Sequence, residues 1–247
     1  MAAEVYGLVG YPLGHSFSRD FFNRKFAAEG IDAEYVNFEI ETIDLLDTVI
    51  ATPGLRGFNV TIPYKQAVMP WLNRLDAVAE AVGAVNVVRV EDDGTLTGSN
   101  SDVFGFVESL RPMLSDGTHR RALVLGTGGA SRAVVAGLRM LDIEPTLVSR
   151  RKNGDTLCYE DVTDAVVANH TVIVNATPLG VSPNVDTLPD IPYRAMTAGH
   201  VAFDLVYNPA DTEFMRHAAA SGAKVKNGLE MLHLQAQRAW QVWHQPR

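Results

Sequence analysis

The sequence predicts an α/β protein in two parts, the first built on a mixed sheet and the second on a doubly wound parallel sheet. Apolar runs alternate with segments of helical periodicity through most of the chain, and a glycine-rich loop at 126–130 separates a strand pattern from a helix pattern. The turn residues Asp92-Asp93-Gly94 lie between two β-forming stretches. They add a hairpin to the first part, which makes its sheet mixed.

The elements of the first part follow from periodicity and from turn residues. A short apolar run at 5–9 predicts a strand, and three phenylalanines on one helical face predict a helix over 18–28 with Ser18 as its N-cap. The remaining predicted elements are strands at 35–40 and 57–61, a helical stretch near 43–52 and hairpin strands at 84–90 and 95–97.

The second part repeats a strand–helix rhythm. A buried-type strand at 122–125 enters the glycine-rich loop, and a helix over 131–141 leaves it. Further strands are predicted at 146–149, 172–175 and 201–204, with helical segments between them. This rhythm is typical of a parallel, doubly wound sheet. Helices are also predicted at 103–110 and 229–243, and the loop at 111–118 resembles a linker.

Composition narrows the class of protein. The chain has 247 residues, of which 47% are hydrophobic and 20% charged, and its net charge of −8 argues against a nucleic-acid binder. Cys158 is the only cysteine, which excludes an intrachain disulfide and a multi-cysteine metal site and fits a reducing, cytoplasmic setting. The sequence shows neither a signal-peptide pattern nor an apolar run long enough to cross a bilayer. We therefore expect a cytoplasmic protein.

The glycine-rich loop, Gly126-Thr127-Gly128-Gly129-Ala130, predicts a dinucleotide site. Glycines let the backbone approach a pyrophosphate, and the N-terminus of the following helix offers free N–H donors. The next strand ends in Ser149-Arg150-Arg151-Lys152, where an NAD site usually has an acidic residue. Because guanidinium groups suit a phosphate, this pattern favours NADP, with a solvated basic turn as the alternative.

Polar residues near the predicted strand ends are candidates for substrate binding. Ser16 and Ser18 follow the first strand, and two hydroxyls at this spacing can donate to one carboxylate, although turn and cap chemistry would also explain them. Asn86 interrupts an otherwise apolar strand. A buried amide there needs a partner, which a ligand could supply.

Lys65 and Asp102 are candidates for catalysis. Lys65 ends the polar segment at 59–65, and Asp102 precedes an apolar helix, where a carboxylate alone is more typical of an N-cap. Reduction of a ketone needs a proton donor for the forming alkoxide, and a lysine near an aspartate can supply that proton. Spacing by itself leaves open whether the two side chains meet.

Eight short motifs follow one another between Tyr6 and Gln235. They are Gly14-His15-Ser16-x-Ser18, Asn59-Val60-Thr61-x-Pro63-x-Lys65, Gly83-Ala84-Val85-Asn86, Gly98-x-Asn100-x-Asp102, Gly126-x-Gly128-Gly129-Ala130, Asn175-Ala176-Thr177-Pro178-Leu179-Gly180, Asp204-Leu205-Val206-Tyr207-Asn208-Pro209 and Gly228-x-x-Met231-Leu232-x-x-Gln235. Each motif alone is weak, but in this order they resemble the successive motifs of the shikimate dehydrogenases.

The resemblance implies two domains and an activity. A substrate-binding domain would comprise residues 1–102 plus 229–247, and a Rossmann-like NADP-binding domain residues 103–228. The implied reaction is the reversible, NADPH-dependent reduction of 3-dehydroshikimate to shikimate, a step of the chorismate pathway to the aromatic amino acids. It would proceed without a metal, in a monomer or homodimer.

The resemblance also assigns residues. Lys65 and Asp102 would form the catalytic pair, and Ser16 and Ser18 would hold the substrate carboxylate. The other implied substrate residues are Asn59, Thr61, Asn86, Tyr207 and Gln235. The implied cofactor residues are Gly126, Thr127, Gly128, Gly129, Ala130, Ser149, Arg150, Arg151, Thr177, Leu205 and Gly228.

The chain departs from the family pattern after the second strand of the second part. Ser149-Arg150-Arg151 takes the place of the family's Asn-Arg-Thr phosphate clamp. The stretch from Lys152 to Tyr159 is too short for the second Rossmann helix that the family usually has before the next strand. The sequence therefore does not predict which residues form the floor of the adenosine pocket. Two other readings remain: a quinate/shikimate dehydrogenase that uses NAD, and a non-catalytic NADP-binding regulator. Retention of both Lys65 and Asp102 argues against the regulator.

Overall fold

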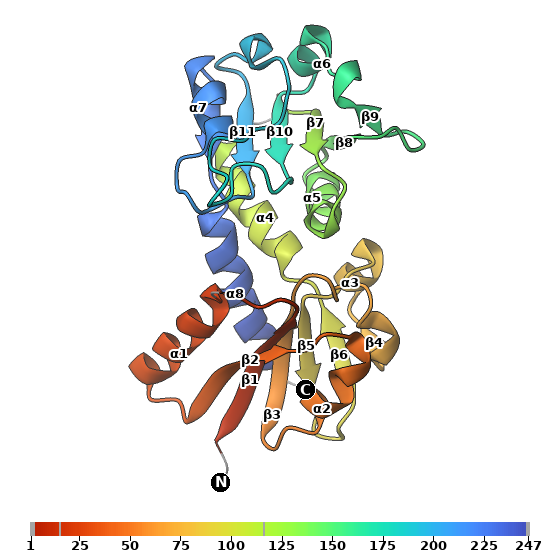
Figure 1. Cartoon of the computed structure of the whole chain (residues 1–247), viewed down its shortest axis with the longest axis vertical. Coiled ribbons are helices and arrows are strands. Elements are labelled where there is room, and N and C mark those ends of the chain that lie inside the picture. Colours follow the sequence, from red (N-terminus) through yellow and green to blue (C-terminus); the bar gives the residue numbers. More distant parts are fainter. Residues whose placement is uncertain (1–2, 15, 116, 246–247) are drawn as a thin grey trace. The chain divides into compact units, whose positions relative to one another are not determined.

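The structure is a computed structural model that describes residues 3–14, 16–115 and 117–245. Its Cα trace separates into two compact units, Met1–Ser101 with Ala236–Arg247, and Asp102–Gln235. One unit holds a mixed sheet and the other an all-parallel sheet (Figure 1), so the predicted α/β fold class is confirmed. His15 of the first motif lies outside the described residues.

The sheet of the first unit has the strand order β2-β1-β3-β5-β6-β4. β1, β2 and β3 are parallel, whereas β5 is antiparallel to both β3 and β6. The predicted hairpin is β5–β6, and its turn contains Gly94 at φ 81°. The strands are β1 (Glu4–Gly10), β2 (Ala33–Glu39), β3 (Leu55–Val60), β4 (Arg74–Leu75), β5 (Val87–Val90) and β6 (Leu96–Ser99).

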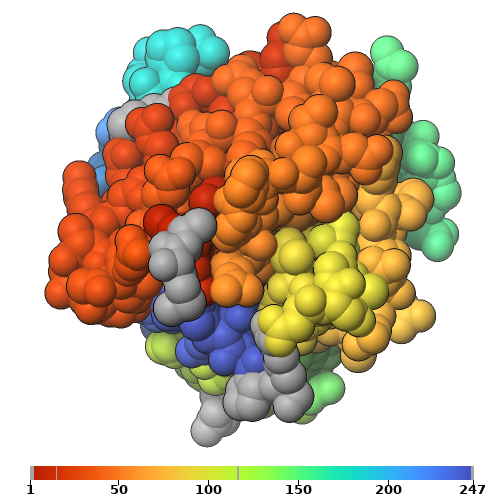
Figure 2. Space-filling model, turned by 90° about the horizontal axis from the view of Figure 1, so that it is seen from below, coloured from red at the N-terminus to blue at the C-terminus, as the bar shows by residue number. Residues whose placement is uncertain are grey.

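Helices pack on this sheet, the first and the last of them through aromatic side chains and the other two through aliphatic ones. The helices are α1 (Phe17–Glu29), α2 (Leu46–Ile50), α3 (Ala77–Val82) and the last residues of α8 (Leu229–Trp243), with 3-10 turns at Ile43–Leu45 and Met69–Trp71. Trp243 is buried beside Tyr6 and Phe22, and its Nε1 donates to the Val88 carbonyl at 3.0 Å. Gly57 makes this contact possible, because a Cβ there would lie 2.4 Å from Trp243 Nε1. Figure 2 shows the blue C-terminal segment between the red N-terminal segments and the yellow hairpin.

Two sequence predictions in this unit were wrong. The N-cap of α1 is Ser16 and not Ser18: Ser16 has extended backbone angles, and its Oγ accepts from the Arg19 N–H at 3.2 Å. The strand predicted to begin at Ala84 begins at Val87. Asn86 precedes it because both its backbone and its side chain are bonded to the segment at Ser99 and Ser101.

The sheet of the second unit is parallel throughout, with the order β12-β11-β10-β7-β8-β9. Read from the β9 edge, with β7 as strand 1, this order is 3-2-1-4-5-6, the order of dinucleotide-binding sheets. The order reverses between β7 and β10, and ligands bind outside the carboxyl ends of strands at such a switch point. The strands are β7 (Arg121–Leu125), β8 (Glu144–Ser149), β9 (Leu157–Cys158), β10 (Val172–Asn175), β11 (Val201–Asp204) and β12 (Lys224–Lys226).

Helices cover both faces of the parallel sheet. Alternate strand residues point to opposite faces, so Val124 packs with Phe106 and Leu138 whereas Leu123 packs with Val167 and Phe214. The helices are α4 (Asp102–Leu110), α5 (Gly129–Met140), α6 (Asp164–Asn169), α7 (Glu213–Ala220) and the first part of α8, with 3-10 turns at Arg111–Met113, Tyr159–Asp161 and Tyr193–Ala195. Within the described ranges no helix is long and apolar enough to cross a membrane.

Candidate active site

The glycine-rich loop lies at the switch point of the parallel sheet. β7 ends at Leu125, Gly126 has φ 106°, and α5 begins at Gly129 with Gly128 as its N-cap. A Cβ at Gly126 would lie 3.1 Å from Thr177 Cγ2, so glycine lets this loop approach the loop after β10. A Cβ at Gly128 would meet no described atom within 4 Å. That side of the loop is therefore open for a ligand.

A cavity of about 640 Å³ adjoins this loop. Its lining combines one residue of the loop with the end of β8 and the segment after it: Thr127, Ser149, Arg150, Arg151, Asn153 and Thr156. Ser149 Oγ accepts from the Arg151 N–H at 3.3 Å and donates to the Arg151 carbonyl, which closes a tight turn. Within the described ranges neither guanidinium has a carboxylate partner. The cavity is thus cationic and suited to a phosphate.

Asn153 and Thr156 are lining residues that the sequence reasoning missed. They lie in the short segment between β8 and β9, where the sequence correctly indicated too little length for a helix. The turn-forming sequence Asn153-Gly154-Asp155 next to a cationic cluster was the available signal, since such turns bring the chain back on itself.

A buried hydrogen-bond network joins the loops that follow β10 and β11. Asp204 is fully buried, and its carboxylate accepts from Asn175 Nδ2 at 2.9 Å, the Val206 N–H at 3.0 Å and Thr212 Oγ1 at 2.6 Å. Asn175 Oδ1 in turn accepts from Thr177 Oγ1 at 2.6 Å. Burial raises the pKa of Asp204 to about 6, although these hydrogen bonds oppose the rise. The network holds Thr177 of the predicted cofactor set in place.

In the first unit, a chain of hydrogen bonds connects several of the predicted substrate residues. Tyr35 Oη donates to Asn59 Oδ1 at 2.8 Å, and Asn59 Nδ2 donates to the Asn86 carbonyl at 3.1 Å. Asn86 Nδ2 then donates to Ser101 Oγ at 3.0 Å, while Asn86 Oδ1 accepts from the Ser101 N–H at 2.7 Å. Burial raises the pKa of Tyr35 well above its usual value, and the neighbouring Ser18 hydroxyl opposes the rise. Motifs distant in sequence therefore converge here.

Tyr35 had no functional assignment in the sequence. Its buried hydroxyl donates to Asn59 Oδ1, so it orients one of the predicted substrate residues. The amide of Asn59 is used in holding Tyr35 and the Asn86 backbone. Asn59 is thereby suited to positioning Asn86.

Lys65 lies in the turns that follow β3 and is half-buried. Its carbonyl accepts from the Val85 N–H at 2.7 Å, which brings its backbone next to the segment that contains Asn86. Thr61, at the start of these turns, donates its N–H to the Val9 carbonyl, and a Cβ at Gly10 would lie 2.5 Å from Thr61 Cγ2. The ends of β1 and β3 are therefore close together, with Thr61 between them.

The other predicted residues lie on helix ends and loops of the second unit. Asp102 is the first residue of α4 and is half-buried, whereas Tyr207 is 40% exposed. Gln235 is buried, and its Nε2 donates to the Leu232 carbonyl at 2.9 Å. Gly228 lies against Leu205, where a Cβ would be 2.2 Å from the Leu205 oxygen.

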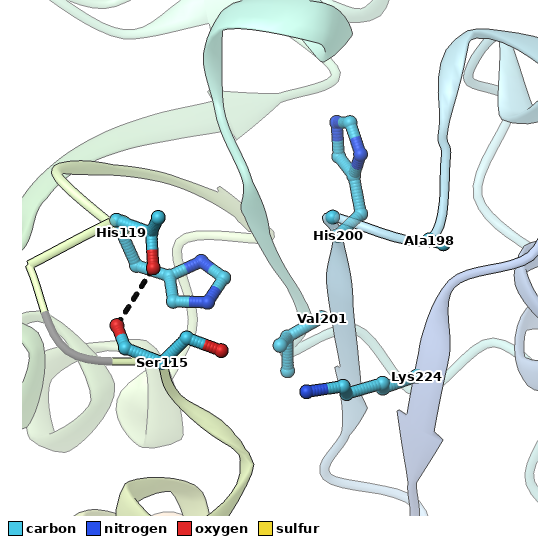
Figure 3. Close-up of a pocket in the computed structure, with 8 residues that line it drawn as sticks. Ser115, His119, Ala198, His200, Val201 and Lys224 are labelled. Atoms are coloured by element: carbon cyan, nitrogen blue, oxygen red, sulfur yellow. Dashed lines mark hydrogen bonds between the residues drawn. The ribbon is translucent and has the colours of Figure 1, made fainter.

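A second, smaller cavity of about 100 Å³ lies at the opposite, amino-terminal edge of the parallel sheet. Figure 3 shows Ser115 and His119 on one side of it and Lys224 on the other. His200 accepts from the Thr197 N–H at Nδ1 and lies 3.2 Å from the Val167 carbonyl at Nε2, so both ring nitrogens are used within the fold. Burial is the main cause that lowers the pKa of His119. These histidines join neighbouring segments, at the edge away from the ligand-binding end of the strands.

Comparison with known proteins identifies the family. The family model for the shikimate dehydrogenase substrate binding domain matches residues 8–88. A curated relative from Oleidesulfovibrio alaskensis, named shikimate dehydrogenase (NADP(+)), is 40% identical over 97% of this chain and 89% of its own length. The chain belongs to the shikimate dehydrogenase family.

Solved structures of this family also match the fold. Shikimate 5-dehydrogenase from Thermus thermophilus, in complex with NADP(H) and shikimate, has a TM-score of 0.85 and 30% identity, with 98% of this chain and 93% of that one covered. Quinate dehydrogenase from Corynebacterium glutamicum, in complex with NAD, has a TM-score of 0.88 and 25% identity, covering 98% and 94%. Both cofactors therefore occur on this fold.

Gly128 and Gly228 are expected to serve different purposes, the first in cofactor binding and the second in packing. A Cβ at Gly128 meets open space, so Gly128→Ala should leave Tm unchanged. If the pyrophosphate lies on the glycine-rich loop as predicted, the added methyl should weaken NADP binding at least about tenfold. Gly228→Ala meets the Leu205 backbone and should lower the free energy of unfolding by about 1–3 kcal/mol. Thermal unfolding and cofactor titration of both variants check this. A drop in Tm for Gly128→Ala would mean that its glycine serves packing.

Proposed function

We propose that this chain is an NADP-dependent shikimate dehydrogenase, which reversibly reduces 3-dehydroshikimate to shikimate in the chorismate pathway of aromatic amino acid biosynthesis. The observation that carries the proposal is the cationic cavity beside the glycine-rich loop, in a chain related over almost its whole length to proteins named shikimate dehydrogenase (NADP(+)). It is an oxidoreductase acting on a CH–OH group of a small molecule.

The second unit suits an NADP molecule. Arg150 and Arg151 offer guanidinium groups for the 2′-phosphate, and the backbone of the glycine-rich loop is open to the pyrophosphate. Thr177, Leu205 and Gly228, on the loops after β10, β11 and β12, are the proposed contacts at the nicotinamide end. Bound there, NADPH supplies the hydride for reduction. We assign residues 103–228 to this cofactor-binding domain.

Residues 1–102 plus 229–247 are the proposed substrate-binding domain. Ser16 and Ser18 bind the carboxylate through their hydroxyls. Ring hydroxyls are bound by polar side chains of the motif residues Thr61, Asn86, Asp102 and Gln235, with Asn59 and Tyr207 completing the site.

Lys65 and Asp102 are the proposed catalytic pair. The Lys65 ammonium donates a proton to the alkoxide oxygen as it forms, and takes it back in the reverse direction. The Asp102 carboxylate accepts a hydrogen bond from the same hydroxyl. No proton has to come from bulk water at the reacting atom. Among the described residues no cluster of three metal-ligating side chains occurs.

Two other functions remain distinguishable. The first is a quinate/shikimate dehydrogenase that uses NAD, and the likeness to the Corynebacterium glutamicum enzyme is the observation in its support. The serine pair and the basic run at 150–152 favour shikimate and NADP instead. A non-catalytic regulator would bind NADP without turnover. For any of these functions we expect a monomer or homodimer in the cytoplasm that needs neither nucleic acid nor a membrane.

The deciding experiment is a spectrophotometric assay of the purified protein with shikimate and quinate, each with NADP and with NAD. We expect the highest kcat/KM for shikimate with NADP, because the guanidinium groups of Arg150 and Arg151 add affinity only where a 2′-phosphate is present. Faster turnover of quinate with NAD would contradict the proposal in favour of the first alternative. NADP binding without turnover of either substrate would favour the regulator.

A further inference from the structure

The connection between β8 and β9 is unusually short. These strands pair in parallel, Val148 with Leu157 and Ser149 with Cys158, yet only residues 150–156 separate them. Parallel neighbours are normally joined by a crossover of a dozen or more residues, usually a helix. A single loop at the outer edge of the sheet (Figure 1) therefore replaces a helix here. It lines the cofactor cavity directly.

A turn fixes which side chains of this loop reach the cavity. The Thr156 N–H donates to the Asn153 carbonyl at 3.1 Å, and Gly154 takes φ 57°, a backbone conformation that glycine adopts without strain. Asn153 and Thr156 are the two ends of this turn, and both line the cavity. Lys152 and Asp155, in the same loop, are not among its lining residues.

The amide group of the Asn153 side chain is available to bind a ligand. The turn uses its backbone carbonyl, and within the described part of the chain its amide group makes no hydrogen bond. The cations beside it, Arg150 and Arg151, match the charge of a phosphate. A neutral amide offers one donor and one acceptor, which match the 6-amino group and the ring N7 of adenine in a paired, planar contact.

We propose that Asn153 recognises the adenine base of the cofactor, through a bidentate contact of its amide with the amino group and N7. This inference rests on the proposed function, since it takes the cavity to be the NADP site. The guanidinium groups then select the 2′-phosphate, and the loop amide selects the base. Base selectivity thus comes from the segment that replaces the crossover helix.

The test compares NADP with nicotinamide hypoxanthine dinucleotide phosphate, in which a carbonyl oxygen replaces the 6-amino group. Dissociation constants are measured by calorimetry on the full-length protein. The unmodified protein should bind NADP about 5- to 100-fold more tightly, since a good bidentate contact discriminates by about 1–3 kcal/mol. Asn153→Ala should bring this ratio close to one, mainly by weakening the binding of NADP, because the analogue keeps only the N7 half of the contact. Asn153 is exposed, so the variant should fold normally.

Matched variants separate base recognition from charge and from loop structure. Asp155→Ala lies in the same turn, and Lys152→Ala removes a cation from the same loop; both should keep the ratio between the two bases. Arg150→Glu should weaken NADP far more than NAD and also keep the base ratio. An Asn153→Ala ratio equal to that of the unmodified protein would overturn the inference, as would NADP binding without any preference for adenine. Absence of NADP binding to the unmodified protein would instead refute the proposed function.

Discussion

Lys65→Ala is expected to lower kcat by about 10²- to 10⁴-fold, the range that general acid–base catalysis contributes. The variant retains every proposed cofactor contact and loses only the ammonium group that would donate the proton to the forming alkoxide. The loss should therefore appear in kcat for shikimate oxidation and in kcat for the reverse reduction. Steady-state kinetics in both directions measure it.

Cofactor affinity and stability are the controls for this variant. The Lys65 carbonyl, which bonds the Val85 N–H, survives the change, so Tm and the dissociation constant for NADPH should stay near those of the unmodified protein. Lys224→Ala, at the amino-terminal edge of the parallel sheet, is a matched lysine substitution outside the proposed site and should keep normal turnover. If Lys65→Ala retained the turnover of the unmodified enzyme, Lys65 could not be the proton donor.

Asp204→Ala is expected to destabilise the protein by about 3 kcal/mol or more. The truncation leaves the buried donors of Asn175, Val206 and Thr212 without their acceptor, and each unpaired buried group costs about 1–3 kcal/mol. The same substitution removes the hydrogen bonds that join the loop after β10 to the loop after β11. Denaturant unfolding at pH 7 measures the change in the free energy of unfolding.

Asp204→Asn is expected to behave in the opposite way. An asparagine can accept from Asn175 and Val206 with its oxygen and donate to the Thr212 hydroxyl with its nitrogen, so the network survives without a buried charge. Because the folded pKa of about 6 lies above the unfolded value of 3.8, the carboxyl favours the folded state most below pH of about 4. That contribution, about 3 kcal/mol, is lost as the pH rises through about 6.

The pH profile of stability distinguishes these variants. The unmodified protein should lose stability between pH 4 and 6 through this group, and Asp204→Asn should remove that part of the loss and match or exceed the unmodified protein at pH 7. A decrease for Asp204→Asn as large as that for Asp204→Ala would show that the network needs the negative charge.

Much of the fold could be predicted because its signals are local. The apolar strand at 122–125, the glycine-rich loop and the following helix form one contiguous pattern, and the structure contains β7, the loop and α5 there. The two-residue strands β4 and β9 could not be predicted, since Arg74–Leu75 and Leu157–Cys158 are too short to show periodicity. These two segments are strands because they pair with the neighbouring strands β6 and β8, and their own sequences carry no strand pattern.

The sequence could predict which motif residues are candidates for the site, but not the hydrogen bonds that join them. Ser18, Asn59 and Asn86 could each be found as polar residues near strand ends. Tyr35 could not, because it reads as one more β-forming residue of a strand. Its hydroxyl reaches Asn59 only through the register of the sheet.

By itself, the sequence determined the α/β class, the order of motifs and the cationic residues after the second strand of the nucleotide half, because periodicity, turn residues and charge are properties of short segments. Tertiary structure alone decided that Asn153 and Thr156 line the cationic cavity, that Asp204 joins the loops after β10 and β11, and that Tyr35 bonds Asn59. Those roles depend on burial and on hydrogen bonds between residues far apart in the chain, which exist only once the sheets have formed.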